Sequence, residues 1–164
     1  MQDARTARTG HATIAEQYWP STLVTERATA ISRTPADVAR ACLSAHRGQD
    51  WDRLRTLFHP RARIGTFAGG GRPEESEKAL TRLREAHQDF IYHADVTTMV
   101  ELSEEAVLLD GRVQYRDGYG MVDIERCWLY VVRDGLLYRS AVYRSSVEAR
   151  TEYEVRGSTL GVPD

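Results

Sequence analysis

Two kinds of hydrophobic spacing divide the chain into a helical part and a strand-rich part. From Thr34 to about residue 90, apolar residues recur every three or four positions, as on one face of a helix. After Phe90 they alternate with polar residues, as in strands with one covered face. The pattern predicts helix, helix, strand, helix, and then four strands joined by hairpins.

Local signals place the ends of the predicted helices. Thr34, followed by proline and then an acid at the third helical position, predicts the start of the first helix, and Gly48 its end. Asp50 starts a short second helix that stops at Pro60. A short strand is predicted over 61–67, and Pro73 with two following acids opens the third helix.

The segment 123–132, DIERCWLYVV, places an arginine among residues that need a core. With the preceding turn centred between Gly118 and Tyr119, Gly111 lies opposite Arg126 and Leu109 opposite Trp128. Arg126 then points to the covered face, where the glycine leaves it room. A slip of one residue would turn it to the other face.

These elements predict an α+β domain, a cone-shaped curved antiparallel sheet whose concave face is covered by three helices. The domain spans 34–150. Residues 1–33 form an N-terminal extension without a sustained period, a composition compatible with disorder, and residues 151–164 form a C-terminal tail.

Composition narrows the functional classes. The 164 residues carry a formal net charge of −2, with 41% hydrophobic and 28% charged residues, as in ordinary globular proteins. No broad basic field favours nucleic acid, and no apolar run is long enough to cross a membrane. Two cysteines and the absence of a signal peptide predict a cytoplasmic protein.

Two stretches, GQDWDRLRTLFHPRARI (48–64) and CWLYVVRDGLLYRSAVYRSS (127–146), resemble the nuclear-transport-factor-like superfamily. Its members include ketosteroid isomerases, SnoaL-like polyketide cyclases, scytalone dehydratases and limonene epoxide hydrolases. The resemblance covers about residues 34–150 and implies a cone that encloses a pocket, but one fold hosts many chemistries.

The catalytic residues of these enzymes do not carry over. The isomerase positions fall near Thr66, Ala41 or Cys42, and Trp128, and none holds the required Asp or Tyr. The Asp-Arg-Asp set of the epoxide hydrolases is also missing, and no inward acid of the cyclase type is found on any predicted strand. The resemblance therefore implies the fold of the domain but not its catalytic mechanism.

Arg126 and Arg144 are the most distinctive candidates for ligand binding. A three-residue loop at Asp134-Gly135 would send both guanidinium groups into the pocket, where they would suit an aromatic or apolar acid. A two-residue loop would place Arg144 on the outer face beside Glu125. The favoured alternative is a structural role for Arg126, either an ion pair with a helix acid such as Glu77 or a side chain that extends to the rim of the pocket.

The predicted pocket binds a small apolar or aromatic ligand, with an acidic one as an option. Tyr115 and His59 are the catalytic acid–base candidates.

No metal-ligand spacing or cofactor motif is present, so no metal or cofactor is predicted. Cys42 and His46 could form a nucleophilic pair, although a cysteine among alanines more often packs. The ligand-binding candidates are Thr66, Arg126, Trp128, Tyr130, Ser140 and Arg144.

The leading functional hypothesis is a small-molecule enzyme acting on a cyclic or aromatic oxygenated metabolite by cofactor-free proton transfer, as an isomerase, cyclase or dehydratase. The alternative is a non-catalytic ligand-binding or regulatory domain, and a third hypothesis is a partner-binding module that uses the N-terminal extension. The outer sheet face is too apolar to be exposed, which predicts a homodimer through it or a docked N-terminal extension. The predicted outer residues are Met99, Leu108, Leu129, Val131, Leu137, Ala141 and Tyr143.

Overall fold

The computed structural model describes residues 33–89 and 92–159. Predictions about the N-terminal extension and residues 160–164 lie outside these ranges. The elements, in chain order, are α1 (Pro35–Arg47), α2 (Trp51–Thr56), β1 (Phe58–Gly65), β2 (Pro73–Glu75), α3 (Ser76–Asp89), β3 (Tyr92–Glu101), β4 (Ala106–Asp117), β5 (Gly120–Arg133), β6 (Leu136–Tyr143), α4 (Ser146–Arg156) and a 3₁₀ turn, η1 (Gly157–Thr159).

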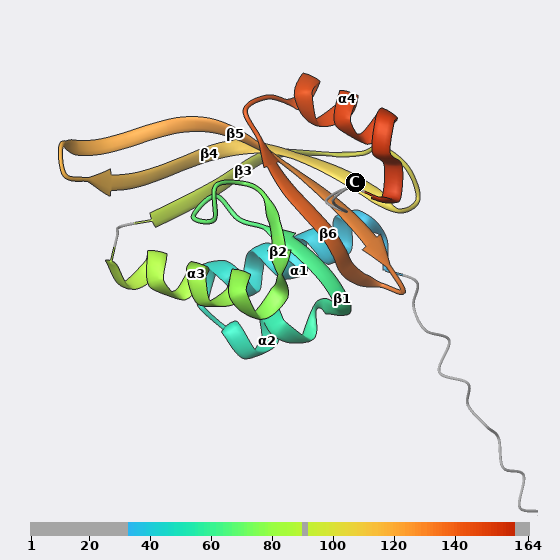
Figure 1. Ribbon diagram of the computed structural model, residues 1–164, viewed down its shortest axis with the longest axis horizontal. Helices are drawn as coiled ribbons and strands as arrows, with labels where there is room; N and C mark the ends of the chain where they lie inside the picture. The colour runs from blue at the N-terminus through green and yellow to red at the C-terminus, as the bar shows by residue number, and fades with distance from the viewer. Residues whose placement is uncertain (1–32, 90–91, 160–164) are drawn as a thin grey trace, which may run out of the picture. The chain divides into compact units, whose positions relative to one another are not determined.

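The six strands form one sheet in the order β2-β1-β6-β5-β4-β3. Neighbouring strands are antiparallel except β1 and β6, which are parallel. Helices α1, α2 and α3 lie on one face of the sheet, called the inner face below, and α4 lies on the opposite, outer face (Figure 1). The α+β class with three helices over the inner face of a curved sheet is confirmed, and α4 is an addition that the sequence did not predict.

The predicted start and end of α1 are confirmed. The Thr34 side chain accepts a hydrogen bond from the Asp37 backbone N–H, and the Asp37 carboxylate accepts one from the Thr34 N–H. This reciprocal arrangement satisfies backbone donors that a helix leaves without partners in its first turn. It fixes the N-terminal end of the helix that later supplies His46 to the inner face.

Two strand boundaries differ from the prediction because proline is tolerated at sheet edges and irregularities. Strand β1 begins at Phe58 and contains Pro60, at a shift in its register with β6 between Phe58 and Arg63. Pro73 begins the short edge strand β2 rather than a helix, and α3 starts at Ser76.

The predicted pairing of β4 with β5 is confirmed residue by residue, with Gly111 opposite Arg126 and Leu109 opposite Trp128. The structure adds a bulge in β3 between Val96 and Thr98, directly beside Gly111. A Cβ atom at Gly111 would overlap the Asp95 carbonyl oxygen, so only glycine fits there. The bulge also turns Met99, predicted to face outward, toward the inner face.

The β5–β6 hairpin matches neither predicted register. Its loop has two residues, Asp134 and Gly135, whose φ angles of 53° and 70° are typical of a type I′ turn. A bulge then shifts the ladder, so that Tyr130 pairs with Ser140 and Trp128 with Val142. The extra residue is Tyr138, and Leu137 packs in the inner core instead of on the outer face.

Helix α4 covers part of the outer face of the sheet, which is too apolar to be exposed to water. Ala149 of α4 is completely buried in one cluster with strand residues of β4, β5 and β6, and Tyr153 packs against the same cluster. The sequence predicted a tail from residue 151, but α4 continues to Arg156. The strand residues of this outer cluster are Ala106, Leu108, Cys127, Leu129, Val131 and Ala141.

Candidate functional site

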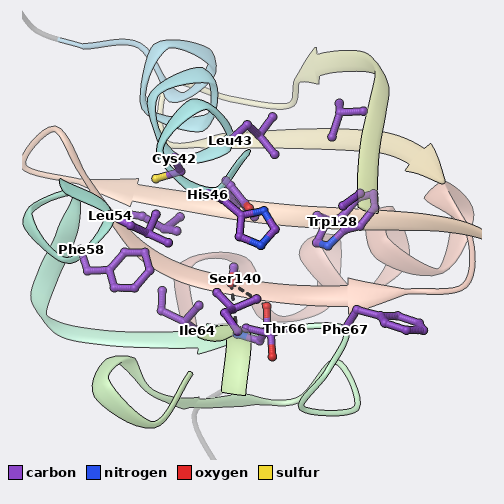
Figure 2. A pocket seen from close by; sticks show the side chains of 16 residues that line it. Cys42, Leu43, His46, Leu54, Phe58, Ile64, Thr66, Phe67, Trp128 and Ser140 are labelled. Atoms are coloured by element: carbon purple, nitrogen blue, oxygen red, sulfur yellow. Dashed lines mark hydrogen bonds between the residues drawn. The ribbon is translucent and has the colours of Figure 1, made fainter. Parts of the chain in front are cut away.

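A partly open cavity lies between the inner face of the sheet and the helices α1, α2 and α3 (Figure 2). Its volume is about 50 Å³. A single water needs about 10–15 Å³ by the same measure, so the cavity as it stands holds only a few waters. The lining residues are Cys42, Leu43, His46, Leu54, Phe58, Ile64, Gly65, Thr66, Phe67, Leu83, Ala94, Val96, Trp128, Tyr130, Leu137 and Ser140.

The lining is apolar and carries no Asp, Glu, Lys or Arg among the described residues. A charged ligand group would therefore be transferred from water to an environment without a counter-charge, which costs several kcal/mol. The cavity suits a neutral ligand, and this argues against the acidic ligand that was considered an option from the sequence.

His46 projects from α1 into the middle of this lining (Figure 2). Burial lowers its pKa from 6.5 to about 4, with further lowering from His87 and His93. The His46 and His87 rings pack edge to face with centroids 4.9 Å apart. At neutral pH His46 is therefore an uncharged imidazole, able to donate a proton from one ring nitrogen and accept one at the other.

Ser140 and Thr66 supply hydroxyl groups to the cavity, and the structure already uses both. The Ser140 hydroxyl accepts a hydrogen bond from the Gly65 N–H and donates one to the Gly65 carbonyl, each 3.1 Å long. The Thr66 hydroxyl accepts a hydrogen bond from the Gly69 N–H at 2.9 Å. Both residues are buried and hold the end of β1 against β6 and the following loop.

Cys42 lies one turn before His46 on α1 and also lines the cavity. Burial raises the pKa of its thiol from 9.0 to about 12. The thiolate is the nucleophilic form, so a Cys42–His46 nucleophilic pair is disfavoured at neutral pH.

Four predicted ligand-binding residues line the cavity together: Thr66, Trp128, Tyr130 and Ser140. Trp128 and Tyr130 are placed there by the confirmed β4–β5 register and Ser140 by the bulge in β6, whereas Thr66 follows β1, which pairs with β6 beside Ser140. The bulge preserves the inward direction of Ser140, although it changes its partner from Trp128 to Tyr130.

Arg126 and Arg144 lie outside the cavity, in an open depression with Thr97, Thr98 and Asp110. The Arg126 guanidinium carbon is 5.5 Å from the centroid of the Phe67 ring, and its Nη1 donates to the Glu125 carbonyl at 2.7 Å. The predicted ion pair with Glu77 is wrong, because Glu77 binds Arg55. The sequence placed Arg126 on the inner side of β5 but could not show that Phe67 lies between it and the cavity.

The two predicted catalytic residues also lie outside the cavity lining. Tyr115 packs against Phe67, with ring centroids 5.5 Å apart. His59 lies 3.6 Å from the Asp134 carboxylate in the β5–β6 turn, and its Nδ1 accepts a hydrogen bond from the Arg61 N–H. Neither position supports an acid–base role in the cavity. His46, which the sequence associated only with Cys42, occupies that place instead.

No group of three or more His, Cys, Asp or Glu residues in the described ranges is arranged to hold a metal ion. None of the described helices combines the length and apolar character needed to span a bilayer. The predicted cytoplasmic location stays a prediction.

The comparisons with known proteins agree on the fold. No protein-family model matches the sequence, and no curated protein gives a sequence match. A proposed polyketide cyclase from Streptomyces antibioticus, IdmH, superposes with a TM-score of 0.57 at 19% identity, covering 69% of this chain and 93% of its own.

Two further solved structures share the architecture. An NTF2-like protein from Burkholderia thailandensis gives a TM-score of 0.59 at 13% identity, over 73% of this chain and 96% of its own. A protein with a ketosteroid isomerase-like fold from Catenulispora acidiphila, solved with trimethylamine, gives 0.57 at 15% identity, over 69% and 88%. The chain therefore has the fold of the nuclear-transport-factor-like superfamily, which includes SnoaL-like proteins and ketosteroid isomerase-like proteins.

Proposed function

We propose that the chain is a small-molecule enzyme that binds a neutral cyclic or aromatic oxygenated compound and moves a proton on it without a cofactor. The observation that carries this proposal is the uncharged imidazole of His46 inside a largely apolar cavity, where no other basic side chain is found among the described lining residues. The proposed polyketide cyclases among the solved neighbours support this reaction class.

His46 is the acid–base residue of this proposal, in place of Tyr115 and His59. A neutral imidazole can accept a proton from a carbon next to a carbonyl and return it to another atom of the same ligand. The low pKa makes His46 a weak base in the free protein, but a negative charge developing on the ligand nearby would raise that pKa. Trp128 and Tyr130 supply aromatic surface that a flat ring can pack against.

The volume of the cavity limits the ligand. A ring compound needs more room than about 50 Å³, so binding it requires a shift of the lining side chains. Phe67 is the candidate for this shift, because it is only half-buried and lies two residues beyond the end of β1. Small ketones should enter more readily than bulky ones.

The alternative is a non-catalytic ligand-binding domain, and the lack of a lining carboxylate favours it. One experiment separates the two. Acetone, cyclopentanone and 2-cyclohexenone are titrated against Trp fluorescence, and the exchange of their α-hydrogens for deuterium in D₂O is followed by NMR. If the protein is an enzyme, the ketones bind and their exchange is accelerated; His46→Gln should abolish this acceleration, and Ser44→Ala, on the exposed side of the same helix, should retain it.

Binding without accelerated exchange would indicate the non-catalytic domain. A protein that binds none of these compounds would overturn both readings. Benzoate serves as the charged comparison and should bind more weakly than the ketones, because the lining offers it no cation.

A homodimer through the outer face stays a prediction. The structure supports it less than the hydrophobic pattern of the sequence did. Helix α4 already buries Leu129, whose exposed fraction is 0%. Sedimentation of the full chain at micromolar concentration measures the oligomeric state directly.

A further inference from the structure

Two arginines lie over the Tyr138 ring on the outer face of the sheet, at the end formed by β6 and the β5–β6 turn, and a third lies on the adjacent strand β1. We call Arg63, Arg133 and Arg139 the arginine cluster. The guanidinium carbon of Arg133 lies 4.0 Å from the Tyr138 ring centroid, and that of Arg139 lies 4.6 Å from it. Arg63 is the register partner of Arg139 on the adjacent parallel strand.

Strand alternation places the cluster on the face opposite the cavity. Ile64 and Ser140 line the cavity, so their neighbours Arg63 and Arg139 point to the other side of the sheet. Val132 packs in the inner core, so Arg133 also points outward. Tyr138 is the bulged residue of β6, and this extra residue lets its ring lie against both guanidinium groups.

In the described part of the chain, none of the three arginines forms an ion pair with a carboxylate. Among residues 33–89 and 92–159, no Asp or Glu oxygen lies within 4.0 Å of a nitrogen of Arg63, Arg133 or Arg139. The neighbouring acids are otherwise placed: Asp134 contacts His59, and Glu75 lies across from Arg63 on β2 without forming an ion pair. Arg133 and Arg139 lie over the same tyrosine ring, and two like charges on one ring are unfavourable without an anion.

Arg139 is the member of the cluster that most clearly lacks hydrogen-bond acceptors. Its exposed fraction is only 8%. Its Nη2 donates to the Tyr138 hydroxyl at 3.3 Å, and its Nε has no acceptor within the described part of the chain. A guanidinium carries five N–H donors, and a buried cation is costly unless acceptors surround it.

We propose that the arginine cluster is a binding site for the oxyanion group of a small molecule, a carboxylate or a phosphate. Guanidinium groups bind such groups with paired, charge-assisted hydrogen bonds. Arg133 is exposed and can swing onto a bound anion, and the hydroxyl of Tyr138 offers a further donor at the same place. The site lies on the opposite face from the cavity, so the test of either proposal does not decide the other.

The test titrates the full-length protein with sodium phosphate and, separately, with sodium acetate, at constant ionic strength held by sodium chloride. Binding is followed by NMR shifts of the amides of 133–139 and by the ionisation of Tyr138. In the free protein, the hydrogen bond from Arg139 and the charges of Arg139 and Arg133 lower the pKa of Tyr138. A bound anion should raise that pKa toward its usual value.

Arg133→Gln should weaken the phosphate or acetate response about tenfold, the usual effect of losing one charge-assisted hydrogen bond. Arg116→Gln is the matched control, since it removes the same charge from an exposed position on the β4–β5 hairpin. A response to only one anion identifies the group that the site takes. Equal responses to chloride and both anions, or equal losses in the two variants, would overturn the proposal.

Discussion

The Ser140 side chain joins β6 to the backbone of Gly65 in β1 through two hydrogen bonds of opposite direction, each 3.1 Å long. Ser140 is 1% exposed, so water cannot replace either bond. A Cβ atom at Gly65 would lie 2.5 Å from the Gly71 carbonyl oxygen and 2.8 Å from that of Ser140. The pair therefore requires this serine and this glycine, and it fixes one wall of the cavity.

Ser140→Ala should lower the free energy of unfolding by about 1–3 kcal/mol, because it removes both bonds inside a buried site. Urea unfolding at pH 7 measures the loss. Ser44→Ala, on the exposed side of α1, is the control and should change stability by less than about 0.5 kcal/mol. Equal effects of the two substitutions would contradict a stabilising role for the bridge.

Gly111→Ala should destabilise the sheet by about 1–3 kcal/mol, because the new methyl group would overlap the Asp95 carbonyl at the β3 bulge. Gly118→Ala is the matched control, since nothing lies within 4 Å of its Cβ position. Thermal unfolding of both variants decides the comparison. A Gly111→Ala protein as stable as Gly118→Ala would mean that the bulge relaxes freely.

The stability of the protein should fall between about pH 6.5 and pH 4 through His46. Its folded pKa of about 4 lies below the ordinary value of 6.5, so in this interval the unfolded chain binds the proton that the folded chain excludes. Stability therefore rises with pH through this window and is fully present above pH 6.5. The shift corresponds to a difference on the order of 3 kcal/mol.

Urea unfolding at pH 4.5 and pH 7 measures this dependence. His46→Gln should reduce it, because glutamine does not titrate, whereas His59→Gln should leave it in place. An unchanged pH dependence in His46→Gln would show that other groups cause it.

Ala149→Glu should separate α4 from the outer face, because it places a carboxylate in a completely buried position among apolar residues. We expect a loss of several kcal/mol and an increase in self-association as the outer cluster becomes exposed. Val155→Glu adds the same charge to an exposed position of α4 and should have little effect. Circular dichroism and sedimentation test the two variants, and similar behaviour of both would contradict the covering role of α4.

The β4–β5 register could be predicted from the sequence because its determinants are local. A short turn fixes which residues face each other, and alternation then assigns each side chain to one face. The positions of Trp128 and Tyr130 in the cavity follow from that rule, as does the placement of Arg126 on the inner side of β5. The capping residues of α1 are equally local, and the sequence determined them as well.

The tertiary structure alone decided where the chemistry lies. The bulges in β3 and β6 each insert one residue, and this reverses the faces of Met99 and Leu137 without any mark in the hydrophobic pattern. Phe67 separates Arg126 from the cavity, and α4 covers the outer face of the sheet. Both arrangements depend on contacts between residues that are far apart in the sequence. Whether His46 packs or faces a cavity depends on how α1 sits over the sheet, and no residue near it in sequence fixes that placement.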